Sequence, residues 1–269
     1  MSLPPLETVR ANGRAIACRA AGEGPPLVLL HGIGSGSASW EAQLDGLAGR
    51  YRAIAWDAPG YGGSDPLPGD SPLCSAYGDA VADLLDGLGL ARVHLLGHSL
   101  GGLIAASFAA RHPGRLVSLT LSDAAAGYLK SSEELRVGRL EARIGAMTTL
   151  GPAEVARRRA REVLSPGAPD EIYEKVFAVQ SRVRPDGYVQ AARMLHGSDI
   201  FPDAAAIRAP ALVMYGSEDR VTPEAIGRDI AAAIPGARYL TLPGLGHASY
   251  VEGPDAFNAA LTGFLDGLA

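Results

Sequence analysis

Short apolar segments rich in leucine or β-branched residues recur along the chain, and most of them end in a glycine-containing turn. Six of these segments have the length of strands, and we predict strands at 26–32, 51–57, 93–99, 116–123, 211–219 and 238–244. Apolar runs without alternating polar positions are typical of strands that are covered on both faces of a sheet. Asn12-Gly13 lies between two further runs and indicates an opening antiparallel hairpin.

Helical patterns fill most of the intervals between these strands, at about 37–49, 75–89, 100–112, 223–234 and 254–267. Strands that alternate with helices favour an α/β fold, because a helix is the usual connection between two parallel strands. The sequence therefore predicts a mostly parallel, doubly wound sheet with right-handed crossovers.

Residues 124–200 interrupt this alternation, since they contain several helical patterns and no clear strand. A structureless loop of this length would be unusual in a compact domain, so we predict an inserted helical lid (cap) there. Residues 1–123 and 201–269 would then form the α/β core domain. The predicted lid carries 12 Lys and Arg against 10 Asp and Glu, and the rest of the chain carries 12 against 19. This asymmetry is consistent with a solvated charged face, or with a lid that attracts acidic substrates.

The composition is that of a globular protein, with 47% hydrophobic and 20% charged residues in a chain of 269. A net charge of -5 argues against nucleic acid as a partner. We expect no membrane partner, because no apolar run approaches the roughly 20 residues that span a bilayer. Two cysteines, Cys18 and Cys74, and a start without a signal-peptide pattern indicate a reducing cytoplasm. The oligomeric state is not readable from the sequence.

Ser99 is the candidate nucleophile, at the centre of Gly97-His98-Ser99-Leu100-Gly101, which matches the pattern G-x-S-x-G. The pattern is weak alone in a chain with 34 glycines. Here a predicted strand precedes it and a predicted helix follows it, which places Ser99 on a tight strand-to-helix turn. The alternative is a serine that only caps the helix.

A serine hydroxyl needs a base within hydrogen-bonding reach to act as a nucleophile. His247 is our candidate, because it lies in a glycine-rich loop after the last predicted strand, where the chain can return to the carboxyl edge of the sheet. The other five histidines lie in a strand, at a helix end, in the lid, beside Ser99, or, as His31, in a loop that its hydrogen bonds would hold together.

An acidic residue should follow a strand between the serine and the histidine, and it would orient the imidazole. Asp219 in YGSEDRVTP meets both conditions. Its neighbour Glu218 is one alternative, and Asp123, at the end of an earlier strand, is the more serious one.

Acyl transfer also requires N–H donors aimed at the developing oxyanion. We predict the backbone N–H groups of Leu100, directly after the nucleophile, and Ile33, in the glycine-rich loop His31-Gly32-Ile33-Gly34.

In order and spacing, HGIGSGSASW, WDAPGYGGSD, GHSLGG, GSEDRVTP and GLGHASYVEGP resemble the α/β-hydrolase superfamily over almost the whole chain. The resemblance supports Ser99, Asp219 and His247 as a triad, with Ile33 and Leu100 at the oxyanion hole. Within the superfamily, HGIGSGSASW and VRPDGYVQAARMLHGSDI look most similar to the 3-oxoadipate enol-lactonase group of small lactonases and esterases.

The predicted function is hydrolysis of a carboxylic ester or lactone through an acyl-serine intermediate, with a small-molecule substrate and neither a metal nor an organic cofactor. Trp40, Tyr128 and Met147 either line an apolar pocket beneath the lid or pack in the core. Arg143 or Arg184 would bind a carboxylate if the substrate is anionic.

Three alternatives remain beside this function. One is carbon–carbon bond hydrolysis of the meta-cleavage type, although those enzymes usually have Asn before the nucleophile and Trp after the base, where this chain has His98 and Ala248. The others are perhydrolysis of the haloperoxidase type and a ligand-binding receptor with negligible turnover.

Overall fold

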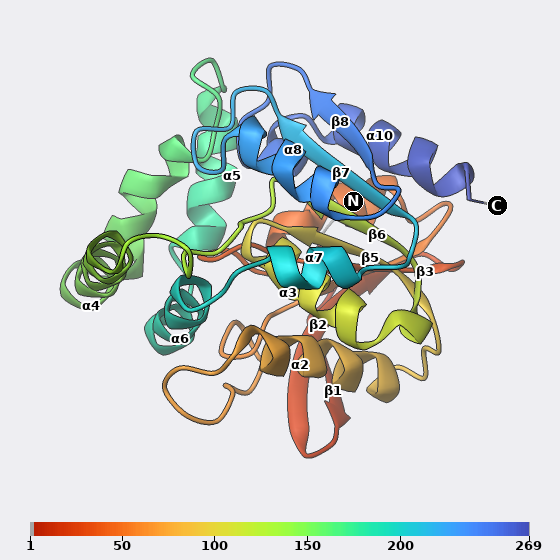
Figure 1. The fold of residues 1–269 in the computed structure, drawn as a ribbon, viewed down its shortest axis with the longest axis horizontal. Coiled ribbons are helices and arrows are strands. Elements are labelled where there is room, and N and C mark those ends of the chain that lie inside the picture. Colours follow the sequence, from red (N-terminus) through yellow and green to blue (C-terminus); the bar gives the residue numbers. More distant parts are fainter. Residues whose placement is uncertain (1–2, 269) are drawn as a thin grey trace.

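The computed structural model describes residues 3–268, and its centre is one eight-stranded sheet. The strands are β1 (Glu7–Ala11), β2 (Arg14–Ala21), β3 (Pro26–Leu30), β4 (Arg52–Trp56), β5 (Val93–His98), β6 (Leu116–Ser122), β7 (Ala211–Gly216) and β8 (Arg238–Leu242). Their order across the sheet is β1-β2-β4-β3-β5-β6-β7-β8 (Figure 1). Both contacts of β2 are antiparallel and the remaining contacts are parallel, which confirms the predicted mostly parallel α/β sheet.

The opening hairpin forms where the sequence predicts it. Asn12 and Gly13 connect β1 to β2 with φ angles of 50° and 76°. A two-residue hairpin turn with both central residues at positive φ matches the twist of the flanking strands, and Asn-Gly is the preferred pair for it.

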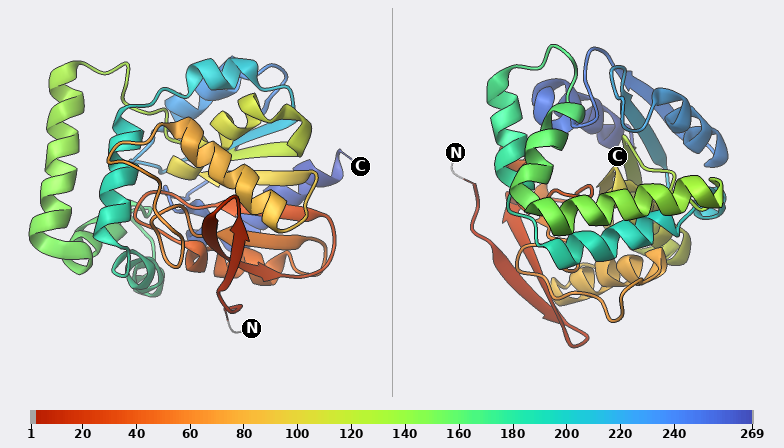
Figure 2. Two further views of the ribbon diagram at one scale, coloured as in Figure 1. Left: turned by 90° about the horizontal axis from the view of Figure 1, so that it is seen from below. Right: turned by 90° about the vertical axis from the view of Figure 1, so that its left-hand side faces the viewer.

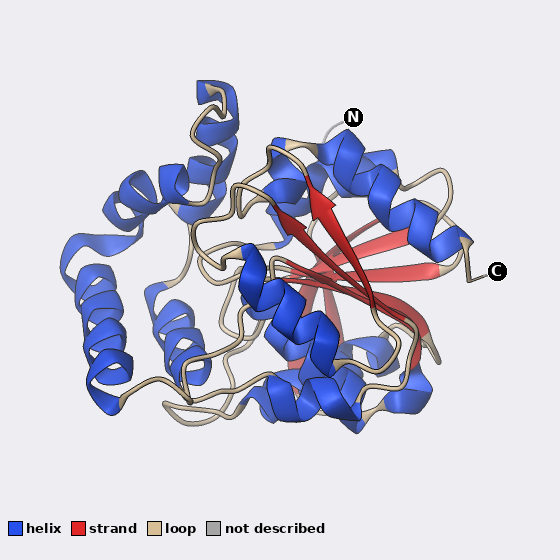
Figure 3. Cartoon of the chain, turned by 45° about the horizontal axis from the view of Figure 1, so that its top comes forward, coloured by secondary structure: helices blue, strands red, loops and turns tan. Residues whose placement is uncertain are grey.

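Helices cover both faces of the sheet (Figure 3). Outside the predicted lid they are α1 (Glu41–Gly46), α2 (Cys74–Gly87), α3 (Leu100–Arg111), α7 (Phe201–Ala206), α8 (Glu224–Ala233), α9 (Ser249–Glu252) and α10 (Pro254–Asp266), with 3-10 helices η1 (Ser37–Trp40) and η2 (Pro113–Arg115). The predicted helix at 37–49 is therefore η1 followed by α1, because the backbone leaves the α-helical region at Trp40, with φ -89° and ψ 16°.

Alternate residues of the central strands enter two separate cores, as expected for strands without a polar face. In β3, Val28 and Leu30 pack with side chains of α2 and α3, whereas Leu27 and Leu29 pack with those of α1 and α10. The sheet is thus held from both sides, and its carboxyl edge is a fixed platform for the loops that follow the strands.

The segment 124–200, between β6 and α7, contains three helices: α4 (Glu133–Glu162), α5 (Asp170–Gln180) and α6 (Pro185–His196). In Figure 2, α4 stands to one side of the sheet and its covering helices. The helix is kinked at Gly151, with φ 76° and ψ 169°, where Pro152 follows and removes a backbone donor. An isolated bridge between Gly127 and Asp199 pairs the two chain ends of this segment. The division into a core domain and a lid stays a prediction, and we call 124–200 the lid segment.

Within residues 3–268, no helix is both long enough and apolar enough to cross a bilayer.

Candidate active site

Ser99 lies between the last residue of β5 and the first residue of α3, in a strained backbone conformation with φ 53° and ψ -116°. Positive φ is rare for a residue with a side chain, and it is typical of the sharp turn that lifts a nucleophile out of a sheet. Backbone hydrogen bonds hold this turn: the N–H of Ser99 donates to Ser122 O at 3.0 Å, and Ser99 O accepts from Gly102 and Ala125. The turn predicted from G-x-S-x-G is therefore present in the backbone.

Gly101 is required by the close approach of α3 to β3 at this turn. A Cβ at position 101 would lie 2.2 Å from Leu30 O and 2.8 Å from His31 O. Both atoms are backbone, so a methyl group could be accommodated only if the helix or the strand moved. We expect Gly101→Ala to lower the free energy of unfolding by about 2–3 kcal/mol, as for other overpacked positions. Urea unfolding followed by circular dichroism measures this change.

Gly263 provides the matched control, because it also lies in a helix and an added Cβ would meet nothing within 4 Å. We expect Gly263→Ala to raise the free energy of unfolding by up to about 1 kcal/mol, since alanine has the higher helix propensity. Equal effects of the two substitutions would mean that the contact with β3 does not constrain the turn.

His247 and Asp219 form a buried pair on the loops after β8 and β7. Nδ1 of His247 donates to Oδ2 of Asp219 at 2.8 Å. Oδ1 of Asp219 accepts backbone N–H groups from Val221 at 2.7 Å and Thr222 at 3.0 Å, and Thr222 Oγ1 donates to Oδ2 at 2.7 Å. The carboxylate is thus fixed by four donors, and Nε2 of His247 is left as the acceptor nitrogen.

Burial raises the pKa of Asp219, but His247 and the hydrogen bonds from His247 and Thr222 outweigh burial, so the pKa is lowered from its ordinary value. The carboxylate therefore stays ionised at neutral pH, as an acid that orients an imidazole must. The contribution of Thr222 was not predicted from the sequence, where it only marks the start of the next helix.

Asp123, the serious alternative to Asp219, is fully buried and is held by other groups. Its Oδ2 accepts the hydroxyls of Ser122 and Ser249 at 2.7 Å each, and its Oδ1 accepts the N–H of Gly216 at 2.8 Å. Burial raises the pKa of Asp123 to about 7. This carboxyl therefore connects the ends of β6 and β7 to α9, while Asp219 accepts the hydrogen bond from His247. Glu218 is exposed on the same turn, with its N–H bonded to Leu245 O.

His98 holds the loop that carries His247, a role that the sequence did not indicate. Its Nε2 lies 2.8 Å from the carbonyl oxygen of His247, so this nitrogen carries the proton and donates. Burial, together with the neighbouring His247, lowers the pKa of His98 to about 3, which keeps the ring neutral. The two residues are 149 positions apart, and no local pattern in the sequence marks such a contact.

The end of α4 is also bonded to the His247 loop. The N–H of Ala248 donates to Val163 O at 2.7 Å. Glu252 accepts the backbone N–H groups of Ser165 and Gly246 at 3.0 Å each. The lid segment is therefore fixed to the loop of His247 directly, through Val163 and Ala248, and by Glu252, which bridges Ser165 and Gly246.

His31 orients the loop that carries the predicted oxyanion donor Ile33. Its Nε2 accepts the N–H of Ala58 at 3.0 Å, so Nδ1 carries the proton and donates to Gly32 O at 2.8 Å. Since the C=O and N–H of one trans peptide point in opposite directions, the Ile33 N–H faces away from His31. Gly32 lies against Ser99, because a Cβ there would be 3.0 Å from Ser99 Cβ. Leu100 begins α3, and the first N–H groups of a helix have no partner within it.

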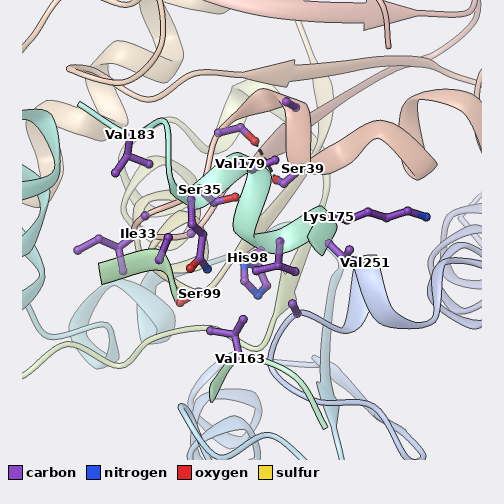
Figure 4. A pocket seen from close by; sticks show the side chains of 18 of the residues that line it. Ile33, Ser35, Ser39, His98, Ser99, Val163, Lys175, Val179, Val183 and Val251 are labelled. Atoms are coloured by element: carbon purple, nitrogen blue, oxygen red, sulfur yellow. Dashed lines mark hydrogen bonds between the residues drawn. The ribbon is translucent and has the colours of Figure 1, made fainter. Parts of the chain in front are cut away.

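A cavity of about 1080 Å³ brings Ser99, His247 and Ile33 together beneath the lid segment. Figure 4 shows Ile33, His98 and Ser99 among the residues that line this space, together with Val163 and Val179 of the lid segment. The volume is at the upper end of the range for small-molecule sites, and the lining is largely apolar. Among residues 3–268, no group of three or more His, Cys, Asp or Glu side chains is arranged to hold a metal ion.

Of the proposed pocket residues, Tyr128, Met147 and Arg143 line the cavity. Trp40 follows the alternative of core packing: its side chain is fully buried against Tyr250, with ring centroids 4.1 Å apart, because η1 packs on the sheet. Arg184 also does not reach the cavity, since its guanidinium donates to Ser64 O at 3.1 Å.

Comparison with known proteins identifies the family of this fold. The family model described as alpha/beta hydrolase fold matches residues 25–254, and the chain belongs to this family.

Two curated relatives and one solved structure are similar over nearly their whole length. The chain is 31% identical to the pimeloyl-[acyl-carrier protein] methyl ester esterase of Chromobacterium violaceum, over 91% of this chain and 96% of the relative. It is 29% identical to the putative carbamate hydrolase RutD of a Caulobacter species, over 90% and 91%. The enol-lactonase from Burkholderia xenovorans superposes with a TM-score of 0.86 at 28% identity, covering 97% of this chain and all of that one. The predicted resemblance to enol-lactonases and small esterases is thus confirmed.

Proposed function

We propose that this hydrolase cleaves a carboxylic ester or lactone through a covalent acyl intermediate on Ser99. The observation that carries the proposal is the pairing of His247 Nδ1 with Asp219 Oδ2, on a loop whose histidine lines the same cavity as the strained serine. The esterase and enol-lactonase among the similar proteins support this type of bond.

In this mechanism Ser99 Oγ attacks the acyl carbon and its proton passes to Nε2 of His247. The positive charge that forms on the imidazole is stabilised by the Asp219 carboxylate. The N–H groups of Ile33 and Leu100 receive the oxyanion, so that negative charge develops where donors are already fixed. His247 then protonates the leaving oxygen, which breaks the ester C–O bond and leaves acyl-Ser99.

Deacylation repeats these steps with water as the nucleophile. Nε2 of His247 takes a proton from the water as its oxygen attacks the acyl carbon, and returns the proton to Ser99 Oγ as the acid is released. In a lactone the leaving oxygen belongs to the same molecule, so the product is a single hydroxy acid, or its keto form if the lactone is an enol ester.

A parallel assay of four bond types tests the proposed reaction. We expect 4-nitrophenyl esters and a five-membered enol-lactone to be hydrolysed with kcat/KM at least about tenfold above an N-aryl carbamate and a vinylogous 1,5-diketone. Phenolate and enolate oxygens are good leaving groups, whereas nitrogen donation makes the carbonyl of a carbamate less electrophilic and the diketone has to release carbon. The carbamate is included because one relative is a putative carbamate hydrolase. Fastest turnover of the diketone would overturn the proposal in favour of carbon–carbon hydrolysis. Turnover of none of the four, with no labelling by a fluorophosphonate, would favour a receptor.

A further inference from the structure

Arg143 on α4 lines the cavity that contains Ser99. Its Nη1 is buried and has no hydrogen-bond acceptor within the described residues. Among residues 3–268 no carboxylate forms an ion pair with it, whereas the other cavity cation on α4, Arg159, lies 3.6 Å from Glu162. A buried N–H of a charged group is costly to leave unpaired, so such a group in a binding cavity indicates that a ligand supplies the acceptor.

The described surroundings of Arg143 give its charge no counter-ion. Burial lowers the pKa of His196 to about 4, and the positive charges of Arg143 and Arg139 act in the same direction. His196 is therefore neutral at neutral pH, and its ring stacks on Tyr128 with centroids 4.4 Å apart. Within residues 3–268 no carboxylate is ion-paired with Arg143, so the anion that its charge requires has to come from a ligand.

From this geometry we infer that Arg143 binds a carboxylate of the substrate, so that the enzyme acts on esters or lactones that carry a free acid group. This inference rests on the proposed ester hydrolysis and specifies its substrate class. The planar guanidinium can donate two parallel hydrogen bonds to a carboxylate, which would fix the orientation of the substrate relative to Ser99. Met147, one helical turn away on the same face of α4, offers the apolar contact for the chain that joins the acid to the ester.

Two pairs of esters that differ only by a carboxylate test the inference. For an acid on the acyl side, the pair is mono-4-nitrophenyl adipate and 4-nitrophenyl hexanoate. For an acid on the alcohol side, it is 6-acetoxyhexanoate and hexyl acetate. We expect the wild type to prefer the anionic member of at least one pair. Arg143→Met should lower kcat/KM for that anionic ester by about 10- to 100-fold, the size of a lost charge-assisted hydrogen bond, and change the neutral ester less than about threefold.

Arg158→Met is the matched control, because Arg158 is exposed, lies on the same helix α4 and does not line the cavity. It removes the same charge from the lid segment and should leave both members of each pair unchanged. Equal loss on the anionic and neutral esters in Arg143→Met, or equal loss in Arg158→Met and Arg143→Met, would overturn the inference.

Ligand binding to variants that lack Ser99 tests the anion site independently of the proposed reaction. Monomethyl adipate titrated into Ser99→Ala by calorimetry should bind at least about tenfold more tightly than into Ser99→Ala/Arg143→Met. Methyl hexanoate should not distinguish the two variants. If none of the esters is hydrolysed but this difference in binding appears, the proposed function fails and the anion site stands. If hydrolysis is found and the difference is absent, the anion site fails alone.

Discussion

Replacing Ser99 with alanine is expected to reduce kcat for a 4-nitrophenyl ester by about 10⁴- to 10⁶-fold, with KM changed little. The hydroxyl is the group that forms the acyl intermediate, and neither His247 nor the N–H donors can substitute for it. Residual turnover would come from the oxyanion donors and from substrate positioning. Stopped-flow and steady-state assays of purified protein measure the loss, and mass spectrometry of fluorophosphonate-treated protein shows whether the covalent adduct forms.

The fold should tolerate Ser99→Ala, because the turn is held by the backbone N–H and C=O of position 99, which alanine keeps. The melting temperature is therefore expected within a few degrees of that of the wild type. Ser39, whose hydroxyl donates to Gly36 O, also lines the cavity and provides the control for labelling. Ser39→Ala should still form the adduct. An adduct on Ser99→Ala would show that another side chain is the nucleophile.

The fold was predictable because each central strand is a continuous apolar run and each turn at the carboxyl edge is rich in glycine. Those are local signals, and the strands β3 to β8 end within a few residues of the predicted positions. Helix 37–49 was predicted less well, since a 3-10 turn at Ser37–Trp40 obeys nearly the same periodicity as an α-helix.

The contacts that support the site are long-range, and the sequence could not supply them. Nothing near His98 in the chain indicates that it bonds to His247 O, because the contact depends on how the loop after β8 returns across the sheet. The position of Trp40 could not be predicted either, because an aromatic residue after a glycine-rich loop fits a pocket wall as well as a core. Arg143 and Arg184 were equivalent by composition, and only the paths of α4 and α6 separate them.

Asp219→Asn is expected to lower kcat by about 10³- to 10⁴-fold through a change in the tautomer of His247. The groups around the wild-type carboxylate determine which atom of the asparagine amide faces His247. Oδ1 receives the N–H groups of Val221 and Thr222, so the amide oxygen must occupy that position. The NH₂ group then occupies the position of Oδ2 and donates to His247 Nδ1. The histidine proton moves to Nε2, which can no longer accept the proton of Ser99.

The pH dependence of Asp219→Asn distinguishes this cause from simple loss of structure. Hydroxide can remove the proton from the wrong tautomer, so the activity of the variant should rise with pH above neutrality by about tenfold per unit, more steeply than that of the wild type. Melting temperatures measured across the same range show whether both proteins stay folded. A fall in activity that is equal at all pH values would contradict the tautomer mechanism.

Asp123→Asn is the matched substitution at the alternative acid, and we expect it to cost less than about tenfold in kcat. Because burial raises the pKa of Asp123 to about 7, the wild-type carboxyl is partly neutral under assay conditions, and asparagine resembles the neutral form. Its amide oxygen can keep the bond from Gly216 N–H, while the hydroxyls of Ser122 and Ser249 can rotate to accept from the NH₂ group. A larger loss in Asp123→Asn than in Asp219→Asn would transfer the orienting role to Asp123, because then the bond between Asp219 and His247 would not be the one that sets the tautomer.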